Sequence, residues 1–334
     1  MAANRYYSGP VSDHFDGTHF FNPGGIEPLG FRQVLRWRWA GGRSVWPKEI
    51  ENSGRTVVPA AQVDDLRVTM VGHATLLLQV AGVNILTDPV WSERVSPVSF
   101  AGPKRFRAPG IAFDALPRID LVLLSHNHYD HLDIRTLRRL KEAYDPLLVT
   151  PLGNDRILAD AGLGMRVTVA DWGDRVETPF GVIHCEPAHH WSARGTRDRR
   201  MALWASFVLE TEAGRIYHIG DTGFHDGINY RAAGEKHGGF RLAILPIGAY
   251  APRWFMKGQH QNPDEAVQGM KLAGAEFAVG HHWSTFQLTD EAMNEPAEQL
   301  AQALQAHGLS ADRFRPLLAG EAWDVPKTGS APTV

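Results

Sequence analysis

The sequence has only one cysteine among its 334 residues, Cys185. An intrachain disulfide needs two cysteines, and all-cysteine zinc and iron–sulfur sites need more, so this chain forms none of them. It also lacks an apolar run of about 20 residues, the length that a membrane-spanning helix requires. Cys185 lies in a predicted strand, and we interpret it as a small buried residue.

Neither sign of charge is in clear excess, and the formal net charge is −3 at pH 7. Proteins that bind nucleic acid through its backbone are usually basic, so we predict no nucleic-acid partner. The first ten residues, MAANRYYSGP, contain no apolar segment of the kind found in a secretion signal. We therefore expect a cytoplasmic protein, and we leave open a peripheral contact with the inner membrane surface.

The hydrophobic fraction is 43%, which is enough for a folded core. Residues 1–59 are rich in Gly, Pro and aromatics, and we predict an irregular extension there that packs on the core or faces a membrane. The region 60–323 alternates short apolar runs with turns and is predicted to form one domain. The tail 324–334 is small and polar, and we expect it to fray.

Strands and helices alternate along the central domain. We predict helices after Asp133, from Asn262 and from Pro296 to Gly308, since Asp and Asn cap helix starts and Pro favours the first turn. This order favours two packed sheets with outer helices. The predicted strands cover 66–72, 75–80, 83–90, 120–126, 147–150, 166–170, 181–188, 203–211, 215–221, 242–248 and 276–280.

Histidine is abundant, with 16 copies, and it is clustered. The run SHNHYDHLD at 125–133 follows a predicted buried strand and contains His126, His128, Asp130 and His131. Two residues that are two apart on an extended backbone point the same way. Four ligand-type side chains within six positions at a strand end can serve two metal ions.

Further ligand-type residues follow three other predicted strands. His189 and His190 follow the strand at 181–188, Asp221 lies between glycines after the strand at 215–221, and His281 and His282 follow the strand at 276–280. If these strand ends converge, their side chains form one cluster. A carboxylate at position 221 could then bridge two metals.

This pattern resembles the metallo-β-lactamase superfamily, and within it the N-acylphosphatidylethanolamine-hydrolysing phospholipase D family and its bacterial relatives. The resemblance covers about residues 66–320. It rests on VGHATLLLQV (71–80), LTDPVWSERVSPVSFAGPKRFR (86–107), SHNHYDHLD (125–133), GDTG (220–223), PIGAYAPRWFMKGQHQNPDEAV (246–267) and HHWSTF (281–286), and the segment DHFDGTHFFNP (13–23) is also similar. It implies an α/β (α+β layered) fold, an αββα sandwich of two packed mixed sheets.

The resemblance also implies a ligand set. His126, His128 and His190 would hold one metal, Asp130, His131 and His282 would hold a second, and Asp221 would bridge both. The family pattern places the ligand directly before Trp, which favours His190 and His282 over His189 and His281. We expect two Zn²⁺ ions, with Fe or Mn as alternatives, and attack on a phosphodiester by a metal-bridging hydroxide.

Other candidate residues carry less weight. His260 would contact the phosphate or donate a proton, or it would simply precede the helix from 262. Asp130 would also steer the proton of the nucleophile. His73 is interpreted as a hydrogen-bonded structural histidine. Candidate substrate contacts are Lys104, Arg105, Arg107, Tyr129, Trp191 and Trp283; for the three basic residues a solvated loop is the alternative.

Residues 31–47 mix Trp37, Trp39 and Trp46 with four arginines. That mixture suits a membrane interface, where Trp and Arg bridge apolar and wet zones. The alternative is an arm that packs its tryptophans on the core.

Two classes of function compete with phospholipid hydrolysis. The same metal site could hydrolyse a lactone, a sugar phosphate or a cyclic nucleotide, because loops choose the substrate in such folds. A metal-stabilised binding protein without turnover is the alternative from another class. The expected partners are a small-molecule or phospholipid substrate, a membrane surface and a second copy of the chain in a homodimer.

Overall fold

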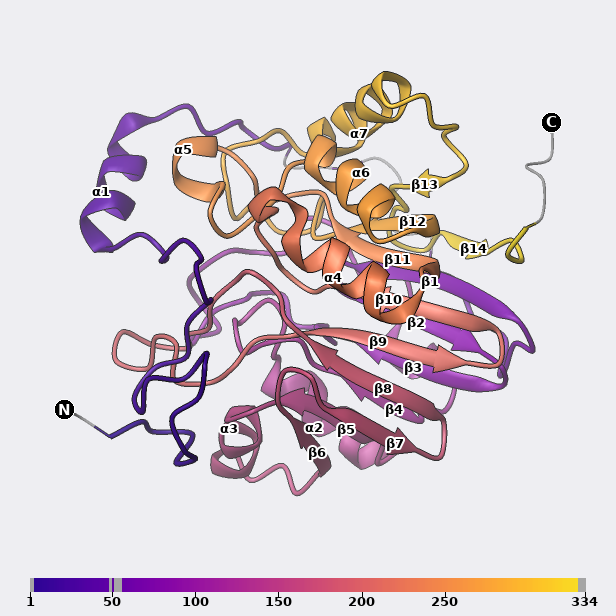
Figure 1. The fold of residues 1–334 in the computed structure, drawn as a ribbon, viewed down its shortest axis with the longest axis horizontal. Helices are drawn as coiled ribbons and strands as arrows, with labels where there is room; N and C mark the ends of the chain where they lie inside the picture. The colour runs from indigo at the N-terminus through magenta and orange to yellow at the C-terminus, as the bar shows by residue number, and fades with distance from the viewer. Residues whose placement is uncertain (1–2, 48–49, 51–55, 330–334) are drawn as a thin grey trace.

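Two seven-stranded mixed sheets form the centre of the molecule, in a computed structural model that describes residues 3–47, 50 and 56–329 (Figure 1). The first sheet has the order β14-β1-β2-β3-β4-β5-β6, with β1 (Leu66–Gly72), β2 (Thr75–Val80), β3 (Val83–Thr87), β4 (Leu121–Leu123), β5 (Leu147–Pro151), β6 (Arg166–Ala170) and β14 (Ala322–Asp324). The second has the order β13-β12-β11-β10-β9-β8-β7, with β7 (Arg175–Thr178), β8 (Gly181–Glu186), β9 (Ser206–Thr211), β10 (Gly214–His218), β11 (Phe240–Pro246), β12 (Ala275–His281) and β13 (Phe314–Arg315).

Helices cover the outer faces of both sheets, as the sequence predicted. The first sheet packs against α2 (Ile134–Ala143) and α3 (Asn154–Asp160), and the second against α4 (Ile228–His237), α6 (Pro263–Leu272) and α7 (Glu295–Ala306). Another apolar layer lies between the two sheets and includes Leu78, Leu123, Phe207 and Ile244. Two peripheral helices, α1 (Phe31–Ala40) and α5 (Arg253–Met256), lie beside each other at one end (Figure 1).

The strand directions bring several loops to one edge of the sandwich. β3, β4, β5 and β6 run parallel to one another, and so do β10, β11, β12 and β13. β8 runs parallel to β10, because both are antiparallel to β9. The carboxyl ends of parallel strands meet at the same edge, so the segments after β4, β8, β10 and β12 converge there.

The helix starts agree with the capping signals in the sequence. The Asp133 side chain accepts a hydrogen bond from the backbone N–H of Arg135 at the start of α2. Asn262 and Glu265 form a reciprocal capping box at the start of α6, with Pro263 in the first turn. α7 ends at Ala306, two residues before the predicted Gly308.

The sequence prediction missed several elements in the described residues. α1 lies inside the segment 1–59, which we had expected to be irregular, and it begins after Gly30 with no side-chain cap. The ten-residue α4 and the shorter elements α3, α5, β7, β13 and β14 were also missed. The predicted strands at 83–90, 120–126 and 203–211 are shortened to β3, β4 and β9, because residues next to the converging loops leave the ladder.

Part of the N-terminal segment is integral to the core. Phe15 and Phe20 are fully buried and pack with Ala188, Leu203 and Trp204. At the other end of the chain, Val325 is buried and its carbonyl accepts a hydrogen bond from Arg241, so the tail is held at least to this point. Residues 330–334 of the predicted frayed tail lie outside the described residues, and the predicted domain limits stay predictions.

No helix in the described ranges has both the length and the apolar character needed to cross a bilayer.

The anchoring of the N-terminal segment can be tested by removing one aromatic ring. We expect Phe20→Ala to lower the free energy of unfolding by about 3–5 kcal/mol, because it empties a fully buried site. Val11→Ala is the control: Val11 is 68% exposed in the same segment, and its truncation should change stability by less than about 0.5 kcal/mol. Chemical denaturation measures both, and equal stability of the two variants would contradict the packing described above.

Candidate metal centre

The turn between β4 and α2 carries the densest group of candidate ligands. His126 follows the strand end, and the backbone N–H groups of His131 and Leu132 both donate to the carbonyl of His128, which closes a tight turn. Asp133 then caps α2. Because a buried strand holds one side of the turn and a capped helix holds the other, its side chains have little freedom.

His126, His128 and His190 form the first part of the centre, which we call the histidine trio. The Nε2 of His126 lies 2.9 Å from the Nδ1 of His128, and the Nε2 of His190 lies 3.3 Å from that same Nδ1. His190 is held by a hydrogen bond of its Nδ1 with the carbonyl of Gln259. Three ring nitrogens therefore face one point from two different loops.

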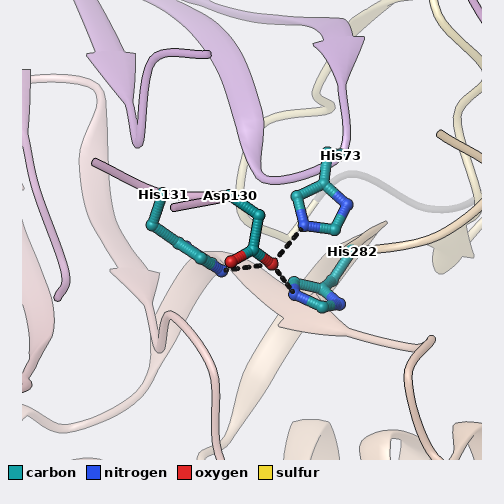
Figure 2. A group of neighbouring side chains, drawn as sticks. All are labelled: His73, Asp130, His131 and His282. Carbon is teal, nitrogen blue, oxygen red and sulfur yellow. Dashed lines mark hydrogen bonds and ion pairs between the residues drawn. The ribbon is translucent and has the colours of Figure 1, made fainter. Parts of the chain in front are cut away.

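His73, Asp130, His131 and His282 form the second part, which we call the mixed cluster (Figure 2). The Oδ2 of Asp130 lies 2.9 Å from the Nε2 of His73, 3.2 Å from that of His282 and 3.6 Å from that of His131. Figure 2 shows the three imidazoles pointing at the carboxylate from different directions. Segments far apart in the sequence thus meet at a single carboxylate.

Asp221 lies between the histidine trio and the mixed cluster. Its Oδ2 is 3.1 Å from the Nε2 of His282, 3.2 Å from that of His131 and 3.8 Å from that of His190. The preceding Gly220 has a positive φ of 66°, and a Cβ there would come within 2.8 Å of the Cβ of Ser125. Glycine is therefore required for the chain to bring Asp221 this close to the turn after β4.

The two histidine doublets divide between the centre and its surroundings. His190 and His282 point into the centre, whereas the Nε2 of His189 accepts a hydrogen bond from the backbone N–H of Ile26. His281 is fully buried and its ring lies 5.6 Å from that of His218. The position directly before each Trp is therefore the one that faces the centre. The family resemblance favoured this position as the ligand, and the ligand assignment stays a prediction.

The donor atoms fit metal binding. Within the described part of the chain, the Nε2 of His131 and the Oδ1 of Asp221 are buried without a hydrogen-bond partner. Buried polar atoms normally have partners, so such atoms at the meeting point of other imidazoles indicate a ligand that completes them. Imidazole and carboxylate are donors that zinc, iron and manganese all accept.

Electrostatics at the histidine trio and at Asp221 favour metal binding as well. Burial lowers the pKa of every imidazole in the histidine trio, that of His128 to about 4. Burial alone would raise the pKa of the Asp221 carboxyl, but the nearby His282 and His131 hold it well below its usual range. At His131 and His282 burial alone would lower the pKa, but the nearby Asp221 carboxylate raises it, that of His282 to about 9. The trio therefore offers neutral nitrogens and Asp221 offers a negative charge, which are the protonation states that a metal ion requires.

Comparison with known proteins now adds to this geometry. A family model described as a beta-lactamase superfamily domain matches residues 83–283. This chain belongs to the beta-lactamase superfamily. The matched region contains the whole histidine trio, Asp221 and all of the mixed cluster except His73.

Individual members of the superfamily show how far the similarity extends. An N-acyl-phosphatidylethanolamine-hydrolyzing phospholipase D 1 of Caenorhabditis elegans is 40% identical over 78% of this chain and 76% of its own length. A Saccharomyces cerevisiae protein is named as a mitochondrial N-acyl-phosphatidylethanolamine-hydrolyzing phospholipase D. It is 34% identical over 70% of this chain, and the matched region covers only 50% of that protein's length. A metallo hydrolase of Ignicoccus hospitalis superposes with a TM-score of 0.57 at 20% identity, over 77% of this chain and 97% of that chain.

These relatives confirm the sequence-based prediction of a metal-dependent hydrolase with an αββα fold. The family membership rests on the family model and the C. elegans relative, whereas the archaeal structure supports the fold alone.

Asp88 also lies at the centre, and it was not among the residues predicted from the sequence. It is fully buried after β3, and its carboxylate accepts hydrogen bonds from the backbone N–H and the hydroxyl of Ser125 and lies 2.8 Å from the Nδ1 of His131. A carboxylate behind a metal-binding imidazole orients the ring and fixes its tautomer. The predicted strand 83–90 contained Asp88, and only the shorter β3, which ends at Thr87, places this residue at a strand end.

His73 also has a different place from the one expected. We interpreted it as a structural histidine, and it is indeed hydrogen-bonded, but its partner is Asp130 of the mixed cluster. Its φ of 57° is unusual for a residue other than glycine and directs the ring toward the centre. The single His in VGHATL gave no spacing pattern from which this position could be predicted.

A pocket of about 610 Å³ opens onto the centre. His128, Asp130, Asp221, His260 and His282 form its polar end. Its remaining walls are mostly apolar; they include Leu29, Phe31, Val34, Trp37, Trp191, Phe255, Met256 and Leu288. The helix α1 and the turn before it therefore supply one wall of the pocket, although they lie far from the centre in the sequence.

The other expected substrate contacts lie away from this pocket. Arg105 is partly buried, donates to the carbonyls of Val90 and Ser92, and has a pKa lowered by burial to about 10. Arg107 donates to the hydroxyl of Ser284, and Lys104 pairs through its backbone with Arg94.

The aromatic candidates divide in the same way. Tyr129 lies under the guanidinium of Arg194, and Trp283 is buried in the core behind His282. Of the six expected contacts, only Trp191 lines the pocket in the described structure, because the loop at 104–107 is held by its own backbone contacts.

The doublet at 189–190 provides a matched pair of variants. We expect His190→Ala to remove metal measurable by elemental analysis and to lower turnover by about 100-fold or more, because it deletes one of three converging nitrogens. His189→Ala should keep the metal and lose only about 1 kcal/mol of stability, through the hydrogen bond to Ile26. Loss of metal from His189→Ala, with retention in His190→Ala, would contradict the arrangement described here.

Proposed function

We propose that this chain is a phospholipase D-type phosphodiesterase that hydrolyses an N-acylphosphatidylethanolamine-like phospholipid at a binuclear metal centre. The observation that carries this proposal is the apolar pocket of about 610 Å³ whose polar end is the cluster of histidines and aspartates. Such a pocket suits a substrate with one anionic group and a long apolar part. The names of the C. elegans and yeast relatives point to the same substrate class.

The proposed ligand set follows the two parts of the centre. The histidine trio would hold one cation, Asp130, His131 and His282 would hold the second, and Asp221 would bridge them. The ring nitrogens and carboxylate oxygens in each group lie within 4.8 Å of one another, which supports this division. Zn²⁺ is the proposed metal because it favours imidazole and carboxylate ligands, and Fe or Mn would suit the same donors.

The chemistry requires water to attack phosphorus. Two bound divalent cations would supply a lowered pKa for a water molecule and positive charge to offset that of the phosphoryl oxygens. The water oxygen bonds to phosphorus, the bond from phosphorus to the ethanolamine oxygen breaks, and the leaving oxygen takes up a proton. Asp130 is placed to accept the proton of the water, since His73 and His282 fix its carboxylate.

Two further residues are proposed to position the phosphate. The Nδ1 of His260 lies 4.0 Å from the Oδ2 of Asp221, and burial lowers the pKa of His260 to about 4, so its neutral ring can hydrogen-bond with the substrate. Arg199 lines the pocket, stacks over Trp191 at 4.6 Å and donates to the carbonyl of Leu29. It replaces Lys104, Arg105 and Arg107 as the proposed cationic contact with the phosphate.

The reaction can be tested with defined lipids. We expect the metal-loaded protein to convert N-acylphosphatidylethanolamine into an N-acylethanolamine and phosphatidic acid, as read by mass spectrometry. In ¹⁸O-labelled water the label should enter phosphatidic acid, because water attacks phosphorus. Metal-free protein should be inactive and should recover activity when Zn²⁺ is added back.

Other products would identify other functions. Release of diacylglycerol or fatty acid would contradict a phospholipase D reaction. Turnover of only a lactone, a sugar phosphate or a cyclic nucleotide would replace the lipid as substrate. Bound metal with no turnover of any ester would favour the binding protein instead.

We also propose that α1 contacts a membrane surface. Leu35 and Trp39 are spaced four residues apart, so they share one face of the helix, and they are 42% and 89% exposed. Trp37 points the other way, where it stacks on Phe255 and donates to Asp290. An exposed apolar stripe next to arginines, beside a pocket that suits lipid, favours binding at the surface of a bilayer.

The membrane contact can be tested by changing only the exposed face. We expect the Leu35→Ser/Trp39→Ser variant to lose most of its co-sedimentation with anionic liposomes, while it keeps its activity on a soluble, short-chain substrate. Val11→Ser/Ile228→Ser is the control, since both residues are exposed outside α1. Liposome binding that is absent in the parent, or unchanged in the α1 variant, would remove the membrane proposal.

A further inference from the structure

A second group of metal-ligand side chains lies on the outer face of the second sheet. His184 of β8, Glu210 of β9 and His237 at the end of α4 each offer one ligand atom, and these atoms lie within 4.8 Å of one another. None of these three residues lines the pocket at the candidate metal centre.

The strand register explains how His184 and Glu210 meet. His184 pairs with Val208 and Val182 pairs with Glu210, so His184 and Glu210 are diagonal neighbours across the two strands. Ile183 and Cys185 face the layer between the sheets, so His184 faces the helices instead. The two side chains are therefore fixed on one face by the pleat of the sheet.

The third residue reaches the sheet from the helix above it. α4 packs over β9 and β10, and His237 is its last residue before Gly238, which caps the helix in the left-handed conformation (Figure 1). The rings of His184 and His237 lie 4.7 Å apart, and the Nε2 of His184 lies 3.6 Å from the Oε2 of Glu210. The group thus joins two strands and a helix.

The state of His184 points to a missing ligand. Its side chain is only 12% exposed, and its Nε2 is buried with no hydrogen-bond partner among the described residues. An imidazole nitrogen that is buried without a partner is uncommon, because the lost hydrogen bond to water is not replaced. A cation between His184 and Glu210 would satisfy this nitrogen.

A carboxylate lies behind His237. The Nε2 of His237 lies 2.9 Å from the Oε1 of Glu186, which is itself buried and paired with Lys236. Metal-binding histidines commonly donate one ring N–H to a carboxylate, which leaves the other ring nitrogen as the ligand. Lys236 pairs with Glu186 and Arg215 pairs with Glu210, so part of the negative charge at this site is already balanced. Charge alone would then attract a cation weakly, and the site would select cations that bind imidazole.

We propose that His184, Glu210 and His237 form a peripheral site for a divalent transition-metal ion, with Zn²⁺ as the best fit, that ties the end of α4 to β8 and β9. Two imidazoles and one carboxylate are a common set of protein ligands for zinc, and a water would complete the tetrahedron. Mg²⁺ and Ca²⁺ prefer oxygen ligands and are expected to bind poorly. The proposal does not depend on the phospholipase activity or on the number of metals at the candidate metal centre.

Counting metal on matched variants tests the site. Each protein is equilibrated with micromolar free Zn²⁺, separated from excess and analysed for zinc by elemental mass spectrometry. The parent should carry one equivalent more than His184→Gln or His237→Gln, and calorimetry should show that equivalent weakened by about ten-fold or more in each variant. His307→Gln is the control, because this histidine pairs with Asp264 outside the group and should leave the zinc count unchanged.

Thermal unfolding supplies a second readout. The parent is first loaded with zinc only at its tightest sites. Further Zn²⁺ should then raise its melting temperature, whereas Mg²⁺ should not. The Gln variants keep a polar side chain of similar reach, so they should fold and lose only this added stabilisation. An equal zinc count in the parent and in both Gln variants would overturn the proposal and would indicate an ion-pair network only. The zinc lost from His190→Ala reports on the candidate metal centre, and that loss does not depend on either outcome.

Discussion

The structure depends on the burial of negative charge at one edge of the sandwich. Asp88 and Asp221 are buried and the side chain of Asp130 is only 14% exposed where the strand ends of both sheets meet, and imidazoles surround each of them. A buried carboxylate is costly unless positive charge and hydrogen bonds compensate for it. Histidines supply part of this compensation, and metal cations would supply the rest. The convergence of loops from both sheets at this edge therefore brings to the carboxylates the imidazoles that compensate for their charge.

The backbone around the centre is strained. His73, Asp88, His282 and Ser284 all adopt positive φ values, which cost a residue other than glycine about 1–3 kcal/mol when the conformation is sparsely populated. His282 is held there by its backbone N–H, which donates to the carbonyl of His73. Strain of this kind persists only where surrounding contacts fix the chain, and here those contacts come from the core of the sandwich.

Much of the fold could be predicted from the sequence, because buried strands and capped helices leave local signals. β1, β2 and β6 have the predicted limits, and Asp133 and Asn262 cap the predicted helices. α1 was missed because it follows a glycine, has no capping side chain and buries none of its residues. Its role depends on long-range contacts that no local pattern encodes.

The candidate site was predictable to the extent that it follows strand ends. His126 and Asp221 could be anticipated from that rule, and the doublets could be resolved only by the resemblance to a family. Asp88 also follows a strand, but it was overlooked because the predicted strand 83–90 ran past it, whereas His73 comes from a turn after β1 and lacks such a signal. Charge alone misled the prediction for Arg105, because its guanidinium is used to hold backbone carbonyls inside the protein.

The N-terminal segment connects the fold to the proposed function. Its aromatic residues anchor it beside the loop that carries His190, and the amide of Asn22 donates to the carbonyl of that histidine. Farther along, α1 forms one wall of the pocket with Val34 and Trp37 and leaves its opposite face exposed. The same short segment can therefore support the metal centre, shape the apolar pocket and present a surface to lipid.

The central claim is that cations complete the buried cluster of imidazoles and carboxylates. Anomalous X-ray scattering at the metal absorption edge, recorded from crystals of the purified protein, tests it most directly. The account predicts two peaks about 3.5–4 Å apart on either side of Asp221, one at the histidine trio and one at Asp130, His131 and His282. Crystals of protein supplied with metal that show no peak beside Asp221 would contradict it.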